Sequence, residues 1–184
     1  MNLFSSFDNC RNDYHTILVN RPPRGREPTM KKRRFQLVDV PISRLANGDS
    51  CNLYVLCTST ELARRVRLIH QWGFQYIGLL VCINQDAAGE PIAFSKGKYF
   101  ANGSTYLVCG SLGSHRSLSE VHEFPAVKIH AVIEQLSRGP FLELFTSHPA
   151  DGWDGWTFGI DSVKRGSRSP RIPDIARSRG RKDS

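Results

Sequence analysis

Short apolar runs recur along the chain, each separated from the next by polar residues. They are residues 15–19, 52–57, 76–83, 105–109 and 141–145, with residues 157–160 as a possible sixth. Runs of this length are typical of β-strands. The runs are continuous rather than alternating, which indicates strands covered on both faces of a sheet.

Two of the intervening segments have the apolar period of an α-helix. The first has three apolar residues on one face: Leu62, Val66 and Ile69. Residues 58–61 before it have the spacing of a capping box, in which a hydroxyl and a carboxylate satisfy the first backbone amides. Gly73 follows as a stop. Three arginines fall mostly on the opposite side, where we expect a solvated face: Arg64, Arg65 and Arg67.

A second helix is predicted near residue 130 by four apolar residues at helical spacing: Ile129, Val132, Ile133 and Leu136. Residues 138–140 end it with a glycine and a proline. Pro41 predicts a short helix over residues 41–45, because proline is favoured in a first turn. Strands that alternate with helices indicate a three-layer α/β domain with a mainly parallel sheet.

In sheets of this kind, ligands bind beyond the carboxyl ends of the strands. We therefore expect the walls of a site in the loops that follow Val19, Cys57, Ile83, Cys109 and Phe145. The sequence contains neither a Gly-x-Gly-x-x-Gly fingerprint nor a Walker phosphate-binding loop. The loop after Val19 is the most unusual, because Asn20 is followed by a double proline and then by a run of positive charge.

The chain has 184 residues and a formal net charge of +8, and the charge is concentrated in two segments. Residues 21–34 and residues 163–184 each carry a net +6, which leaves −4 for the rest of the chain. Such segments favour polyanions, nucleic acid first, although solubility or targeting is the simpler alternative. We expect residues 162–184 to be disordered when free and residues 1–13 to be flexible. The predicted folded domain is then residues 14–161.

The five cysteines are odd in number and form no Cys-x-x-Cys pair: Cys10, Cys51, Cys57, Cys82 and Cys109. Four of them lie in apolar runs, so we expect buried thiols rather than a disulfide framework or a zinc site. This favours a reducing compartment, nuclear or cytoplasmic, with the nucleus favoured in a eukaryote. No apolar run approaches the ~20 residues of a membrane-spanning helix, and the N-terminus lacks the pattern of a secretory signal.

Other residues that could perform chemistry have simpler interpretations. Three histidines lack a Cys or a carboxylate at metal-ligand spacing, which favours surface or loop positions: His115, His122 and His130. Three serines in loops lack the Gly-x-Ser-x-Gly elbow of hydrolases: Ser104, Ser111 and Ser114. Trp153 and Trp156 could stack on bases, but core packing is favoured.

Six short motifs follow one another in the order Tyr14-x-x-Ile17-Leu18 before the double proline, Trp72-Gly73-Phe74, Gly97-Lys98-Tyr99-Phe100-x-Asn102, Leu107-Val108-x-Gly110, Ile133-Glu134, and Leu142-Glu143-Leu144-Phe145 through Gly152-Trp153. Together they resemble the MT-A-seventy family. Its members are S-adenosylmethionine-dependent N6-adenine methyltransferases, including both subunits of the eukaryotic mRNA adenosine methyltransferase. The resemblance covers about residues 14–161. It implies a Rossmann-like methyltransferase fold, with a mainly parallel sheet and helices on both faces.

The family's catalytic motif, Asp-Pro-Pro-Trp after the first strand, aligns with Arg21-Pro22-Pro23-Arg24. In the family, the Asp side chain and a proline carbonyl accept from the adenine amine while the aromatic ring stacks on the base, so catalysis is mainly positioning and polarisation. Arg21 has only donors and cannot accept, and Arg24 lacks the bulk of an indole. Related enzymes use Asn-Pro-Pro-aromatic, and Asn20 is a competent acceptor. However, Arg21 separates it from the prolines, and no aromatic residue follows Pro23.

The family's cofactor contacts are also changed. Its Arg-Asn pair appears as Ala101-Asn102, which loses a cation, and its Gly-Asn-Glu appears as Gly159-Ile160-Asp161. Asn102 and Asp161 retain groups able to contact the ribose or the amino-acid part of S-adenosylmethionine. The resemblance therefore implies that binding of this cofactor is weak or lost.

The basic residues near the predicted site and in the tail are the candidate contacts to RNA or DNA. Those at residues 31–34 also match the pattern of a nuclear localisation signal. The candidates are Arg21, Arg24, Arg26, Lys31, Lys32, Arg33, Arg34, Lys96, Lys98, Lys164 and Arg165.

Three hypotheses follow from the sequence. The first is a pseudo-enzyme, a non-catalytic subunit that forms a heterodimer with an active methyltransferase paralogue and binds nucleic acid. The second is a divergent but active N6-adenine methyltransferase that uses Asn20. The third is an α/β RNA-binding protein without a methyltransferase partner.

Overall fold

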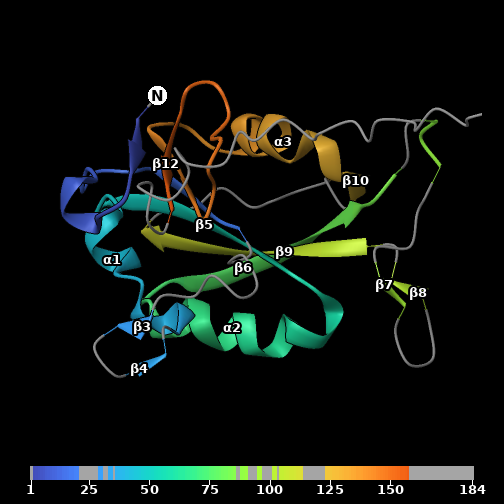
Figure 1. The fold of residues 1–184 in the computed structure, drawn as a ribbon, viewed down its shortest axis with the longest axis horizontal. Helices are drawn as coiled ribbons and strands as arrows, with labels where there is room; N and C mark the ends of the chain where they lie inside the picture. Colours follow the sequence, from blue (N-terminus) through green and yellow to red (C-terminus); the bar gives the residue numbers. More distant parts are fainter. Residues whose placement is uncertain are drawn as a thin grey trace, which may run out of the picture.

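The computed structural model describes residues 2–20, 29–30, 33–34, 36–85, 88–90, 95–96, 101–102, 104–113 and 123–157. Within these ranges an eight-stranded mixed sheet lies between helices (Figure 1). The strands follow one another across the sheet in the order β1-β12-β11-β2-β5-β9-β6-β10. This is the Rossmann-like α/β architecture that the sequence predicts.

The strands of the sheet are β1 (Leu3–Phe4), β2 (Thr16–Val19), β5 (Ser50–Cys57), β6 (Gln75–Ile83), β9 (Ser104–Gly113), β10 (Glu123–Pro125), β11 (Phe141–Leu144) and β12 (Trp153–Trp156). The α-helices are α1 (Ile42–Leu45), α2 (Leu62–Gln71) and α3 (Ile129–Leu136). Short 3-10 turns are η1 (Phe7–Asn9), η2 (Leu37–Asp39), η3 (Ser59–Glu61) and η4 (Ala126–Lys128). Two further strand pairs are β3 (Thr29–Met30) with β4 (Arg33–Arg34), and β7 (Ser95–Lys96) with β8 (Ala101–Asn102).

The central strand β2 is buried along its whole length, and its side chains alternate between two apolar layers. Ile17 and Val19 belong to the layer that includes α2 residues Leu68 and Ile69. Leu18 points to the other face, where it belongs to the same apolar cluster as Ile133 of α3. Figure 1 accordingly shows α1 and α2 on one side of the sheet and α3 on the other. The prediction of strands covered on both faces is confirmed.

Strand β9 differs from its predicted form in length and in direction. It extends to Gly113, beyond the predicted end at Cys109, and runs antiparallel to both of its neighbours, β5 and β6. The remaining pairs of the sheet are parallel. The carboxyl end of β9 therefore lies beside the amino ends of its neighbours, at the opposite end of the strands from the carboxyl ends of β2 and β5. The prediction that the loop after Cys109 is a wall of the site is wrong.

The predicted capping box is confirmed at η3, directly before α2: the Thr58 amide donates to Glu61 Oε2 at 3.2 Å, and the reciprocal bond is also present. The arginines that follow do not all face solvent. Arg64 and Arg67 are exposed, whereas Arg65 is buried and makes an ion pair of 2.8 Å with Glu61. The two residues are four apart, so the Arg65 side chain folds back onto η3, the turn that precedes α2.

The N-terminal segment is part of the fold, in contrast to the loose segment expected for residues 1–13. Strand β1 extends the sheet beside β12, and the ring of Phe7 stacks on Trp156 with 4.0 Å between centroids. The buried Asp154 accepts from the Asn2 amide at 2.9 Å and from the Tyr14 hydroxyl at 2.9 Å. The N-terminal segment lies beside β12 because its apolar residues cover what would otherwise be an open edge of the sheet.

Residues 153–156 form a strand, β12, that is not among the predicted apolar runs. Trp153 and Trp156 are buried in opposite layers. The possible strand over residues 157–160 lies, apart from Thr157, outside the described residues. The prediction that both tryptophans pack in the core is confirmed.

Four of the five cysteines are buried and all five are free thiols: Cys51, Cys57, Cys82 and Cys109 are buried, and Cys10 is partly buried. Burial raises the pKa of Cys51 and of Cys82 to about 12, because the low-dielectric interior disfavours the thiolate. No helix in the described ranges is long and apolar enough to cross a membrane.

Candidate functional site at the carboxyl ends of β2 and β11

The order of the strands reverses at β2. The chain passes from β2 to β5 on one side, and returns much later through α3 to β11 on the other side. The carboxyl ends of β2 and β11 therefore form a topological switch point, where sheets of this kind bind their ligands. Asn20 follows β2 directly, and its backbone amide donates to the Leu144 carbonyl at 3.2 Å. Of the catalytic motif, residues 20–24, the structure describes the side chain of Asn20 alone, and this residue lies at the carboxyl end of β2.

A buried carboxylate organises the side chains at this point. Glu143 lies in β11, is only 2% exposed, and faces the layer of α3. Its Oε1 lies 3.1 Å from Asn20 Nδ2, and its Oε2 lies 3.1 Å from His130 Nε2. A buried carboxylate is tolerated when its oxygens are hydrogen-bonded. The two contacts meet that requirement from two separate elements, β2 and α3.

The carboxylate fixes which way the Asn20 amide faces. An ionised carboxylate only accepts, so the nitrogen of the amide must face Glu143. The Oδ1 oxygen is then turned away from Glu143, as an acceptor. The same rule makes His130 Nε2 the donor in its contact. Asn20 is thus oriented by Glu143, a residue 123 positions away in the sequence.

Aromatic packing supports His130 on the α3 side. Its ring meets Trp153 edge to face with 5.0 Å between centroids, and Trp153 also stacks on Phe141 at 4.8 Å. The Trp153 indole nitrogen donates to Glu134 Oε1 at 2.6 Å, which ties β12 to α3. The cluster of Asn20, His130 and Glu143 is therefore held by the sheet on one side and the helix on the other.

The described residues at the carboxyl ends of β2 and β11 do not by themselves form a binding site for S-adenosylmethionine. The backbone turns sharply after β11, where Phe145 has a φ of +67°. The backbone amides of Phe145 and Thr146 both donate to the Trp156 carbonyl, at 2.7 and 3.2 Å. These two donors are therefore already engaged within the sheet. Glu143 is buried and occupied.

Most of the predicted site residues lie outside the described residues. These are Arg21, Pro22, Pro23, Arg24, Arg26, Lys31, Lys32, Lys98, Asp161, Lys164 and Arg165. Arg33 and Arg34 lie in β4, Lys96 in β7 and Asn102 in β8, where the structure describes the backbone alone. Their assignment to nucleic acid or cofactor stays a prediction.

Sequence reasoning missed Glu143 and placed His130 at the surface or in a loop. His130 is instead a residue of α3 whose side chain is 30% exposed and contacts the buried Glu143. One sequence signal could have indicated the contact between His130 and Glu143, because Glu143 is the only charged residue of the apolar strand β11. A charge at such a position needs a partner. No group of three His, Cys, Asp or Glu able to hold a metal ion occurs among the described residues.

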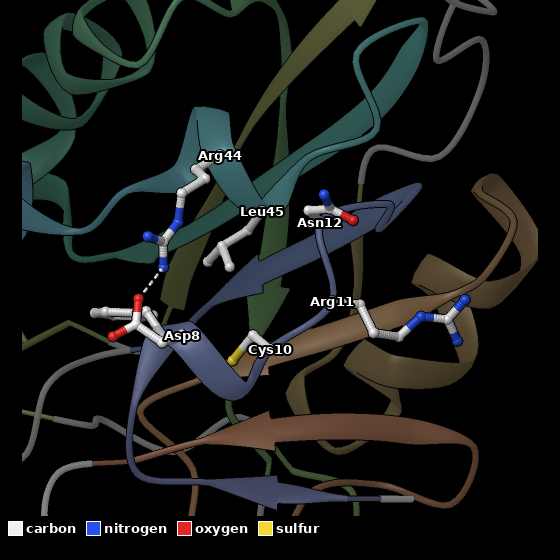
Figure 2. Close-up of a pocket in the computed structure, with 7 residues that line it drawn as sticks. Asp8, Cys10, Arg11, Asn12, Arg44 and Leu45 are labelled. Atoms are coloured by element: carbon white, nitrogen blue, oxygen red, sulfur yellow. Dashed lines mark hydrogen bonds and ion pairs between the residues drawn. The ribbon is translucent and has the colours of Figure 1, made fainter.

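A pocket of about 350 Å³ lies between the N-terminal segment and α1, away from this cluster. Arg44 and Asp8 form an ion pair of 3.0 Å across its rim, and Arg11 extends away from that pair (Figure 2). Cys10 also lines the pocket, and burial raises the pKa of its thiol to about 11. A thiol that stays protonated at neutral pH is a poor nucleophile, so this pocket does not indicate cysteine chemistry.

The fold and the switch point define a Rossmann-like α/β protein. One comparison with known proteins links the chain to methyltransferases. The type II methyltransferase M.MunI from Mycoplasma sp. is 23% identical over 151 residues, covering 74% of this chain and 61% of that protein. The chain therefore matches about three fifths of the length of this relative. No protein-family model matches the chain. The similarity supports a relationship to methyltransferases.

Proposed function

We propose that this chain is a methyltransferase-fold subunit that has lost its own transfer chemistry, supports an active paralogue and binds nucleic acid. The observation behind this proposal is the closed cluster at the switch point. Glu143 is buried and engaged by Asn20 and His130, at 3.1 Å each. The residue that aligns with the catalytic aspartate of N6-adenine methyltransferases is Arg21.

The chemistry of adenine methylation explains why this matters. The adenine amine is a poor nucleophile, because its lone pair is delocalised into the ring. An enzyme helps by accepting hydrogen bonds from the amine while holding it in line with the methyl group. Arg21 can only donate, and its positive charge opposes a cationic methyl donor such as S-adenosylmethionine. A fold kept intact around a lost acceptor is typical of a subunit retained for its shape.

Charge supports the nucleic-acid part of the proposal. Residues 21–34 begin directly after the switch point and carry a net +6. A basic segment placed there would hold a polyanion beside the site. The buried free cysteines fit a reducing compartment, and in a eukaryote we propose the nucleus.

Three measurements test the proposal. Calorimetry of the purified chain with S-adenosylmethionine should detect no binding. Methylation of adenine-containing RNA and DNA should be absent for the chain alone. Co-expression with a paralogue that has an intact Asp-Pro-Pro-Trp motif should yield a stoichiometric complex that is more active than the paralogue alone. Methylation by the isolated chain would overturn the proposal, as would the failure of any such complex to form.

The orientation of Asn20 favours a second candidate, a divergent but active N6-adenine methyltransferase. Because Glu143 holds the amide nitrogen, the amide oxygen faces away from this carboxylate, and an oxygen acceptor is what an adenine amine requires. Under this reading the chain binds S-adenosylmethionine, and Asn20→Ala abolishes methylation while Asn12→Ala, an exposed asparagine elsewhere, leaves it unchanged. Equal activity of the two variants would remove this candidate.

A further inference from the structure

A second hollow lies on the α2 side of the sheet, at a distance in the fold from the switch-point cluster. Its volume is about 370 Å³, and it lies between η2 and the exposed face of α2. Arginines 64, 65 and 67 all line it, together with Gln71 one turn further on. We infer that this hollow is a phosphate-binding site for the backbone of a nucleic acid.

The first argument is unbalanced charge. Arg64 and Arg67 are three residues apart on α2, so they are neighbours on the helix surface and repel each other. Glu61 neutralises Arg65, through an ion pair of 2.8 Å. Within the part of the chain that the structure describes, Arg64 and Arg67 have no ion-pair partner. An anion between them would relieve the repulsion.

The second argument is the position of Arg65. Its side chain is nine-tenths buried, with its Nη2 fixed by Glu61. Its Nε is buried and has no hydrogen-bond partner among the described residues. A buried donor without a partner costs free energy, so the Arg65 side chain would gain a hydrogen bond by turning toward a phosphate oxygen in the hollow. Arginine suits this task because its planar group presents several donors at fixed angles.

The opposite wall fits a nucleotide rather than a bare ion. It consists of residues 36–38, where Val38 is 40% exposed, one of two large apolar side chains so exposed among the described residues. An apolar surface beside guanidinium groups suits a sugar or a base next to its phosphate. The basic strand β4 ends at Arg34, two residues before Gln36, so the predicted basic loop leads directly into this wall.

This inference rests on the proposed binding of nucleic acid and names a place for it. It does not depend on whether the chain binds S-adenosylmethionine or has a partner. A phosphate held at α2 would extend the track of the polymer from the switch point across the α2 side of the molecule.

The test compares two variants that remove the same charge from opposite sides of the sheet. Arg64→Gln with Arg67→Gln removes two exposed arginines from the hollow. Lys128→Gln with Arg138→Gln removes two exposed cations next to α3. Both pairs are at the surface, and circular dichroism and a thermal melt of each full-length variant establish that it is folded. The probes are fluorescein-labelled single-stranded 20-mers of RNA and of DNA, measured by fluorescence anisotropy between 50 and 300 mM salt.

We expect the hollow variant to bind about tenfold more weakly than wild type at moderate salt. The slope of log affinity against log salt should become shallower by about 1.4, since each contact to a single strand contributes about 0.7. The α3-side variant should stay close to wild type. Equal losses in the two variants would overturn the inference, because they would reflect net charge alone, and unchanged binding in the hollow variant would overturn it too. Calorimetry with S-adenosylmethionine on the same variants tests the methyltransferase proposal separately.

Discussion

Glu143 is the residue on which the order of the switch point depends. It lies in a buried strand, yet both of its oxygens are within 3.1 Å of a donor from another element. Without it, the Asn20 amide nitrogen would lose the acceptor that orients it, and α3 would lose a polar contact with the sheet. The effect of losing Glu143 on stability can be measured on the isolated chain.

Glu143→Gln should lower the free energy of unfolding by about 1–3 kcal/mol. The substitution keeps the volume but leaves one oxygen for two donors, so one of Asn20 and His130 loses its acceptor. Urea denaturation followed by tryptophan fluorescence measures the change. Asp13→Asn is the control, because Asp13 pairs with Arg11 at an exposed position, where ion pairs contribute about 0–1 kcal/mol. If the two substitutions cost the same, the cluster adds nothing to stability.

At the scale of elements, the pairing of the end of β9 with the start of β5 depends on a glycine, because Gly113 lies opposite Ser50. Gly113 ends β9 with a φ of +75°, and a Cβ added there would overlap the backbone oxygen of Asp49. Gly152, before β12, has a φ of +80° but open space around it. Substitution at Gly152 therefore tests backbone strain alone, whereas substitution at Gly113 tests strain together with a steric clash.

Gly152→Ala should cost about 1–2 kcal/mol, the strain of a left-handed conformation in a residue with a side chain. Gly113→Ala should cost distinctly more, because the backbone of Asp49 must also move. Thermal unfolding of both variants beside Gly48→Ala, where the added Cβ meets nothing, gives the comparison. Similar losses at Gly113 and Gly152 would contradict the clash.

The sequence predicts elements best where local pattern and burial agree. The apolar period of α3 and the capping box of α2 each depend on residues a few positions apart, and both are confirmed. The direction of β9 is not encoded locally, because an apolar strand reads the same in either direction. The burial of Arg65 and of Asp154 depends on partners that the fold brings to them, Glu61 and Tyr14. Asn20 was found because a strand end is a local feature, whereas its partner Glu143 is 123 residues away.

At the scale of the whole molecule, the buried thiols and phenols make the fold sensitive to alkali. Burial raises the pKa of Cys51 and Cys82 to about 12, above the ordinary value of 9.0. Burial also raises the pKa of Cys109, Tyr14 and Tyr54. The native state favours the protonated form of each group. Their contribution to stability is therefore complete below about pH 9 and is lost as the pH rises toward 12.

The urea midpoint should accordingly fall between pH 8.5 and pH 10.5, by an amount equivalent to about 1 kcal/mol or more for each buried cysteine. Cys51→Ala should show a shallower decline over the same range, because alanine does not titrate. Equilibrium denaturation at four or five pH values measures both curves. A midpoint that stays constant up to pH 10.5 would contradict the expected effect of the buried groups.

The antiparallel strand β9 also sets an order in which the chain can fold during synthesis. β5 and β6 leave the ribosome first, but they meet in the sheet only through β9, which is made after both. Premature pairing of β5 with β6 would close the gap that β9 must enter. The nascent chain therefore has to keep two apolar strands apart until residue 113 has emerged, and β1 waits longer still for β12. In a ribosome-bound chain that ends before β9, we expect β5 and β6 to remain unpaired and accessible to chaperones.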